Sequence, residues 1–196
     1  MAADASRTVL VDMDGVLADF DRRVAQALLD KCPRLRDLGT RREFRLTTAF
    51  PEYDREISSV TSRSGFFREL PVIEGALAGW KRIEAAGFTP RVCSSPLRRN
   101  HRCEQNKRWW LAHYLGRDVA RQAIIDSDKA AHRGVALIDD RTDIVGAGGR
   151  AAWQLVLFDA SYNRGYDAPR LLGWQDPNLE SILHAARTRY LERFSR

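Results

Sequence analysis

The chain has 196 residues, 44% of them hydrophobic and 30% charged, a size that allows one well-buried domain with a modest insertion. No apolar run approaches the roughly 18 residues of a membrane-spanning helix, so we expect no association with a membrane. The formal charge of +6 comes from basic residues that are scattered among acids, without an aromatic-interleaved basic patch. We therefore expect a small anionic substrate rather than nucleic acid.

The N-terminus and the cysteines indicate a cytoplasmic protein. The first residues, MAADASRT, resemble neither a signal peptide nor a transit peptide, and we expect residues 1–7 to form a loose tail. Cys32, Cys93 and Cys103 form no CxxC pair, and their odd number argues against a disulfide framework. These features favour a reducing compartment.

In chain order, the first predicted elements are a strand over residues 8–13 and a helix over residues 16–30. The next segment, residues 33–71, contains helical fragments at 41–46 and 54–61 but no apolar run suited to a core strand. It predicts a small, mostly helical insertion. The α/β core is then expected to comprise residues 8–32 and 72–196.

Beyond the insertion, short apolar runs alternate with helical periodicity. Strands are predicted at residues 90–93, 123–125, 135–138 and 154–158, and helices at 76–86, 103–114 and 179–194. This alternation is typical of an α/β fold with a parallel sheet covered on both faces.

Polar residues follow each of the first four predicted strands. They are Asp12 and Asp14, then Ser94 and Ser95, then Lys129, and finally Asp139 and Asp140. In open α/β sheets the functional residues gather at the carboxyl ends of the strands. Carboxylates from two strand ends can bind one Mg²⁺, while a hydroxyl and an ammonium group hold a phosphoryl group. This set therefore predicts phosphoryl transfer chemistry.

These motifs also resemble a known family. DMDGV, a strand-end Ser, a Lys and LIDD, in that order, resemble the four motifs of the haloacid dehalogenase (HAD) superfamily of phosphatases. More narrowly, VLVDMDGVLADF, VCSSPL, Asp128-Lys129, LIDDRTDI and VLF resemble the 5'(3')-deoxyribonucleotidases, the type C 5'-nucleotidases. The resemblance extends from about residue 8 to 176. It implies a three-layer, Rossmann-like parallel sheet, with residues 33–71 as a small helical cap inserted after the first strand and helix.

The resemblance also implies roles for the four aspartates. Asp12 would be the nucleophile that forms an aspartyl-phosphate, and Asp14 the general acid and base. Mg²⁺ would be bound by Asp12, Asp140 and the backbone carbonyl of Asp14, with Asp139 orienting a metal-bound water. One carboxylate must stay ionised while the other holds a proton, so their environments should separate their pKa values.

The same resemblance implies that Ser94, Ser95 and Lys129 bind the phosphate group and that Phe20 lines a nucleobase pocket. It implies a (deoxy)nucleoside monophosphate as substrate and, since this family often pairs its subunits, a homodimer. The aromatic residues of the cap do not align with those that stack on the base in the family. A sugar phosphate or biosynthetic intermediate therefore stays open as an alternative substrate.

Two other interpretations use different chemistry. CSSPLRR, from Cys93 to Arg99, has the Cys-x5-Arg spacing of cysteine phosphatases, but Pro96 removes one N–H group from the loop that would bind phosphate. A receiver-like regulatory module also gathers acids, a hydroxyl and a lysine at strand ends, but it carries its phosphorylated Asp at a later strand end than its acidic pair. The carboxylate set favours the aspartate mechanism.

Overall fold

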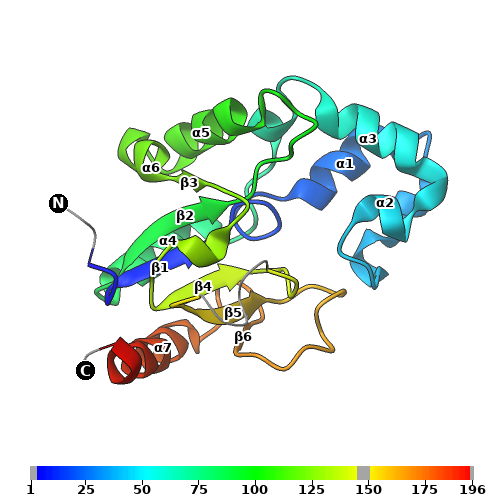
Figure 1. Cartoon of the computed structure of the whole chain (residues 1–196). Coiled ribbons are helices and arrows are strands. Elements are labelled where there is room, and N and C mark those ends of the chain that lie inside the picture. Colours follow the sequence, from blue (N-terminus) through cyan, green and yellow to red (C-terminus); the bar gives the residue numbers. More distant parts are fainter. Residues whose placement is uncertain (1–3, 145–150, 195–196) are drawn as a thin grey trace.

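A six-stranded parallel sheet forms the centre of the computed structural model, which describes residues 4–144 and 151–194 (Figure 1). Its strand order is β3-β2-β1-β4-β5-β6. The strands are β1 (Thr8–Val11), β2 (Thr89–Ser94), β3 (Ile124–Ile125), β4 (Ala136–Asp139), β5 (Gln154–Phe158) and β6 (Arg170–Leu171). The strand order reverses around β1, so the carboxyl ends of β2, β1 and β4 lie next to one another, where α/β sheets bind ligands.

Seven α-helices are described, some of them very short. They are α1 (Phe20–Leu28), α2 (Leu46–Ala49), α3 (Asp54–Ser62), α4 (Ala76–Ala85), α5 (Cys103–Tyr114), α6 (Arg117–Gln122) and α7 (Leu179–Phe194). Short 3₁₀ helices occur at Pro33–Thr40, Pro51–Tyr53, Phe66–Glu69 and Lys129–Ala131. No helix in the described part of the chain is both long and apolar enough to cross a membrane.

The sheet is buried on both faces, which explains why its strands are continuously apolar. Val9 and Val11 of β1 belong to the large core cluster, together with Ile83 of α4 and Leu183 of α7. Leu10, which points to the opposite face, belongs to a smaller cluster on the side of the Lys129–Ala131 turn. The three layers expected from the sequence are therefore confirmed.

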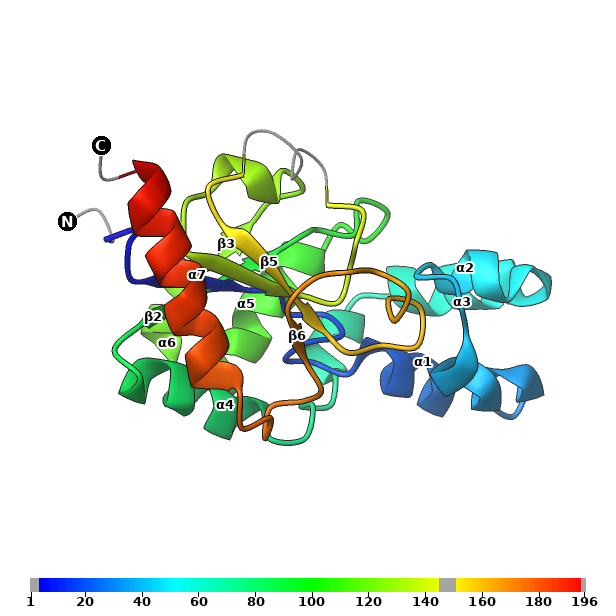
Figure 2. The same ribbon diagram turned by 90° about the horizontal axis from the view of Figure 1, so that it is seen from below.

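Residues 33–71 lie to one side of the sheet, together with α1 (Figures 1 and 2). The segment contains only short helices and turns, as the sequence predicts, and α1 packs against α3. Its apolar side chains, such as Ile57 and Phe67, are buried in the same core cluster as β1. The segment is thus attached to the α/β core through a continuous apolar contact.

The first predicted helix is shorter than the sequence suggests, because it begins at Phe20 instead of residue 16. The N–H groups of Leu17 and Ala18 both donate to the carbonyl of Met13, which folds residues 13–18 into a tight loop. Asp19 then caps the helix by accepting a hydrogen bond from the backbone of Arg22. The apolar residues of this loop are buried in the core without being helical, so their spacing was misleading.

The predicted helical fragment at 41–46 is also wrong, since α2 begins only at Leu46. The guanidinium group of Arg41 donates to the backbone carbonyls of Glu43 and Phe44, and this holds the preceding residues in a bend. The short elements α6 and β6 were not predicted, because a few residues carry no periodicity to detect.

Residues 1–3 of the expected N-terminal tail lie outside the described residues. Residues 4–7 form a turn, and Arg7 Nε donates to the carbonyl oxygen of Gly87 at 3.0 Å. This contact connects the turn to the loop between α4 and β2.

Candidate active site

The loop that follows β1 positions two of the predicted site residues. The N–H group of Asp12 donates to the carbonyl of Ile138 at 2.9 Å, so Asp12 continues the hydrogen-bond ladder to β4. Gly15 turns the chain with φ of +80°, a conformation that favours glycine. A Cβ atom at this position would lie 2.4 Å from Oδ2 of Asp140, so glycine is also required for space.

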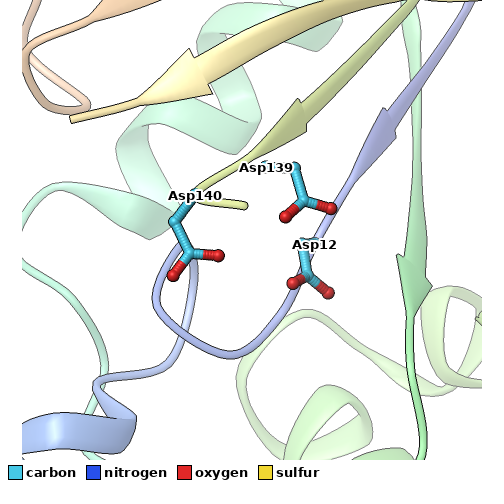
Figure 3. A group of neighbouring side chains, drawn as sticks. All are labelled: Asp12, Asp139 and Asp140. Carbon is cyan, nitrogen blue, oxygen red and sulfur yellow. The ribbon is translucent and has the colours of Figure 1, made fainter. Parts of the chain in front are cut away.

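Three buried aspartates converge at the ends of β1 and β4. Asp12, Asp139 and Asp140 each place one carboxylate oxygen within 4.8 Å of the others, as Figure 3 shows. All three residues are at most 5% exposed. Carboxylate oxygens are the ligands that a hard divalent cation prefers, so the cluster suits a metal ion.

Lys129 provides the positive charge at this cluster. Its ammonium nitrogen lies 3.0 Å from Oδ1 of Asp12 and 2.5 Å from Oδ2 of Asp139. Burial alone would lower the pKa of Lys129, but the two carboxylates raise it above its ordinary value, so the lysine stays charged. One ammonium against three carboxylates leaves an excess of negative charge, which favours binding of a cation.

Asp140 offers a carboxylate oxygen that has no donor. The Tyr162 hydroxyl donates to Oδ2 of Asp140, whereas no hydrogen-bond donor among the described residues reaches its buried Oδ1. Burial, and then the neighbouring carboxylates of Asp139 and Asp12, raise the pKa of Asp140 well above its ordinary value. Because an unpaired buried carboxylate oxygen is costly, this atom indicates a place where a cation fits.

Asp139 is different, since both of its oxygens already have partners. Oδ2 contacts Lys129, and Oδ1 accepts a hydrogen bond from the backbone N–H of Arg141 at 3.0 Å. Its side chain is fully buried. These contacts fix the Asp139 carboxylate against Lys129, whose ammonium group also contacts Asp12.

The pKa values of Asp12 and Asp14 are shifted in opposite directions. Burial alone would raise the pKa of Asp12, but the ammonium groups of Lys129 and Lys107 outweigh burial and hold the value below normal. For Asp14, burial is the larger effect and raises the pKa, although Lys107 opposes it. The separation has the sign needed for an ionised nucleophile beside a protonated acid.

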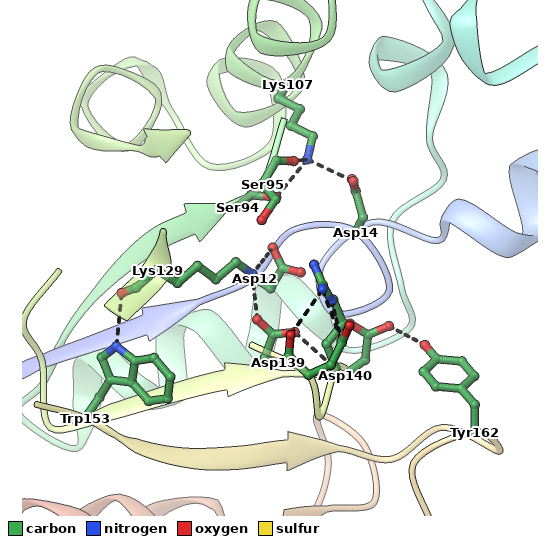
Figure 4. A network of polar contacts seen from close by, with 12 residues as sticks. Asp12, Asp14, Ser94, Ser95, Lys107, Lys129, Asp139, Asp140, Trp153 and Tyr162 are labelled. Carbon is green, nitrogen blue, oxygen red and sulfur yellow. Dashed lines mark hydrogen bonds and ion pairs between the residues drawn. The ribbon is translucent and has the colours of Figure 1, made fainter. Parts of the chain in front are cut away.

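Lys107 is a site residue that the sequence interpretation missed. Its ammonium nitrogen lies 2.8 Å from each of three oxygens, namely Asp14 Oδ2, Ser94 Oγ and the carbonyl of Ser95 (Figure 4). The chain has only four lysines, and Lys107 lies on the buried face of α5. The sequence feature that could have indicated its role is a lysine at a buried helix position in a chain with few lysines.

Phe20 lies at the start of α1, next to the inserted segment. Its ring contacts those of Phe66 and Phe67, with centroid distances of 5.3 and 6.1 Å. Phe67 in turn lies 5.2 Å from the ammonium group of Lys107. The predicted base-lining residue is thus connected to the site through one aromatic neighbour.

The cysteine phosphatase interpretation does not fit this geometry. Cys93 lies within β2, where it pairs with Ile124, and it is fully buried. Burial raises the pKa of its thiol to about 12, so almost no thiolate is present at neutral pH. Arg99 donates to the Thr61 hydroxyl at 3.0 Å, in the inserted segment.

The comparisons with known proteins agree with this geometry. Residues 6–188 match the family described as "5' nucleotidase, deoxy (Pyrimidine), cytosolic type C protein". A Bordetella pertussis protein named "Putative 5'(3')-deoxyribonucleotidase" is 36% identical over 167 residues, which cover 83% of this chain and 89% of the relative. The human 5'(3')-deoxyribonucleotidase of cytosolic type is 32% identical over 192 residues, covering 91% and 94% of the two chains.

A solved structure supports the fold. A HAD family hydrolase from Deinococcus radiodurans, crystallised with bound phosphate and sodium, superimposes with a TM-score of 0.54 at 18% identity. The alignment covers 95% of this chain and 97% of the other.

Proposed function

Because the chain belongs to the 5'(3')-deoxyribonucleotidase family and is therefore a phosphoric monoester hydrolase, we propose that it hydrolyses (deoxy)nucleoside monophosphates to nucleoside and phosphate with Mg²⁺. The observation that carries this proposal is the pair Asp12 and Asp14. Asp12 belongs to the buried aspartate cluster, Asp14 lies two residues later in the chain, and their pKa values are shifted in opposite directions.

In the proposed reaction, Asp12 attacks the phosphorus atom. The bond from phosphorus to the ester oxygen breaks, and an aspartyl-phosphate forms on Asp12. Asp14 gives its proton to the departing alkoxide and then, as a carboxylate, takes a proton from water. That water attacks the phosphorus, which releases inorganic phosphate and regenerates the carboxylate of Asp12.

The phosphoryl group would be held from two further strand ends. Ser94 is the last residue of β2 and Ser95 follows it, and Lys129 lies within 3.0 Å of the nucleophile. In this proposal they bind the phosphoryl oxygens, and the charge of Lys129 balances the negative charge that accumulates there.

Asp12, Asp140 and the Asp14 carbonyl would bind Mg²⁺, and Asp139 would orient a metal-bound water. The unpartnered Oδ1 of Asp140 and the all-oxygen donor set fit this cation. When bound, Mg²⁺ would neutralise the phosphate and the crowded carboxylates.

Residues 33–71 would form the cap that closes over the leaving group, with Phe20 at its base. Aromatic residues support this arrangement, since Phe20 contacts Phe66 and Phe67 of the segment. We also propose a cytoplasmic location, which the three buried free thiols support.

Phosphate release from a panel of deoxynucleotides, ribonucleotides and sugar phosphates tests the function. We expect nucleotide hydrolysis that requires Mg²⁺, stops on chelation and is lost in Asp12→Asn. A kcat/KM that is much higher for sugar phosphates would contradict the nucleotide substrate, while leaving the aspartate chemistry intact. Activity that survives both chelation and Asp12→Asn would overturn the mechanism.

A further inference from the structure

We propose that Lys107 is a positioning residue that holds the Asp14 carboxylate in its reactive orientation, because its ammonium group is itself fixed by Ser94 and Ser95 at the end of β2. This inference rests on the proposed function, because it concerns the same site. It assigns a role to a buried cation on α5, which lies outside the motifs at the strand ends.

The first step is that Lys107 has no hydrogen-bond donor left for a substrate. An ammonium group has three N–H bonds, and Lys107 has three oxygen partners at 2.8 Å each, from Asp14, Ser94 and Ser95. Its side chain is fully buried. Lys107 therefore acts through its neighbours instead of binding phosphate itself, in contrast to the role proposed for Lys129.

The second step concerns Asp14. Lys107 occupies Oδ2, and no hydrogen-bond donor in the described part of the chain reaches the buried Oδ1. When Asp14 carries a proton, that proton therefore lies on Oδ1, because Oδ2 already accepts a hydrogen bond. The lysine thus selects the oxygen from which the leaving group receives its proton.

The third step concerns Ser94. Its oxygen accepts a hydrogen bond from Lys107, so its own O–H points away from the lysine. One ammonium group therefore connects the proposed acid on the β1 loop to the phosphate-binding end of β2. A tetrahedral ammonium suits three converging oxygens, whereas a planar guanidinium does not.

The experiment compares two substrates that differ in their need for a proton. A nucleoside leaves as an alkoxide and requires protonation, whereas p-nitrophenolate leaves without it. For Lys107→Met we expect kcat/KM to fall about 100-fold for a deoxynucleotide and less than about 5-fold for p-nitrophenyl phosphate. We use kcat/KM because it reports the steps up to aspartyl-phosphate formation and excludes its hydrolysis.

Three further variants complete the design. In Asp14→Asn, kcat/KM should fall selectively for the deoxynucleotide, as in Lys107→Met. In the double variant, kcat/KM for the deoxynucleotide should fall by less than about a further threefold relative to Asp14→Asn. Lys129→Met should reduce kcat/KM by a similar factor for both substrates. Lys81→Met, at an exposed lysine of α4, should change neither.

Equal losses on both substrates for Lys107→Met, or no loss on either, would overturn the proposal. If Lys107→Met does not fold, Lys107→Gln is measured instead, since its neutral amide has only two N–H donors for the three oxygens, and the same selectivity is required. A wild-type protein that hydrolyses neither substrate would contradict the proposed function, which is a separate outcome.

Discussion

The hydroxyl group of Tyr162 donates a hydrogen bond to Oδ2 of Asp140. The same tyrosine ring lies 4.3 Å below the guanidinium group of Arg41, which forms an ion pair with Asp21. One side chain thus contacts both a proposed metal ligand and the inserted segment. A residue that hydrogen-bonds to a metal ligand fixes the orientation of that ligand and thereby contributes to metal affinity.

Replacing this hydroxyl should weaken metal binding. Tyr162→Phe removes the donor to Asp140 but keeps the ring, so the contact with Arg41 is retained. We expect the apparent dissociation constant for Mg²⁺ to rise by about tenfold, because Asp140 loses its fixed orientation. The measurement is activity as a function of Mg²⁺ concentration, together with calorimetric titration of the metal. Tyr166→Phe, at a tyrosine that is 49% exposed, is the control, and an unchanged Mg²⁺ constant in Tyr162→Phe would contradict the role.

Gly15 should tolerate no side chain. In Gly15→Ala the methyl group would meet Asp140 at 2.4 Å, at a φ of +80°. We expect a loss of stability of about 1–3 kcal/mol from the backbone conformation and a fall in kcat of about 100-fold from displacement of Asp140. Thermal unfolding and steady-state kinetics measure the two effects.

The matched control for Gly15 is Gly39→Ala. Nothing lies within 4 Å of a Cβ atom at Gly39, and its φ is not positive. This variant should keep both stability and activity. If Gly15→Ala behaved in the same way, the close approach of Asp140 would be irrelevant to the site.

The nucleophile can be assigned by comparing Asp12 with Cys93. A thiol with a pKa of about 12 is almost entirely protonated at neutral pH, so Cys93→Ala should keep its activity within about threefold. Asp12→Asn should lose about 1,000-fold or more in kcat. Kinetics on both variants and mass spectrometry after iodoacetamide treatment provide the measurement. Inactivation that tracks alkylation of Cys93 would reverse this assignment.

Arg82 should stabilise the junction of α4 and α7. It donates to both carboxylate oxygens of Glu180 at 2.8 Å and to the backbone carbonyls of Trp174 and Asp176 at 2.7 and 3.0 Å. Arg82→Met should cost about 1–2 kcal/mol at pH 7, mostly from the two carbonyl bonds, because solvent screens the partly exposed ion pair. Denaturant unfolding measures this loss, with Lys81→Met as the control.

The pH dependence of this loss has a definite sign. The hydrogen bond from Arg82 lowers the pKa of Glu180 below its ordinary value of 4.5. The ion pair therefore contributes stability above pH 4.5, and this contribution is lost as the pH falls through the lowered pKa. The difference between the wild type and Arg82→Met should shrink below pH 4. An equal difference at pH 7 and at low pH would show that the pair contributes nothing.

Long periodic elements could be predicted from the sequence, and short or irregular ones could not. The helices predicted at 103–114 and 179–194 match α5 and α7 residue for residue, because their periodicity extends over three turns or more. The start of α1 was wrong, since Val16 and Leu17 are buried in a loop instead of a helix. Apolar residues buried in a loop and apolar residues buried in a helix can have the same spacing in the sequence.

The α/β class and the polar residues at the strand ends could be predicted from local patterns in the sequence. Alternating apolar runs predict a parallel sheet, and parallel strands all present their carboxyl ends at one edge, so Asp12, Ser94 and Asp140 were expected at the same edge. For these residues, the local sequence was sufficient to predict a position at the candidate site.

Which cation contacts which carboxylate could not be predicted from these local patterns. Lys107 and Asp14 are far apart in the sequence, and their contact depends on how α5 packs beside the ends of β1 and β2. The pairing of Tyr162 with Asp140 depends in the same way on the segment after β5. Such contacts arise from the packing of whole elements, and the periodicity within one element carries no information about its neighbours.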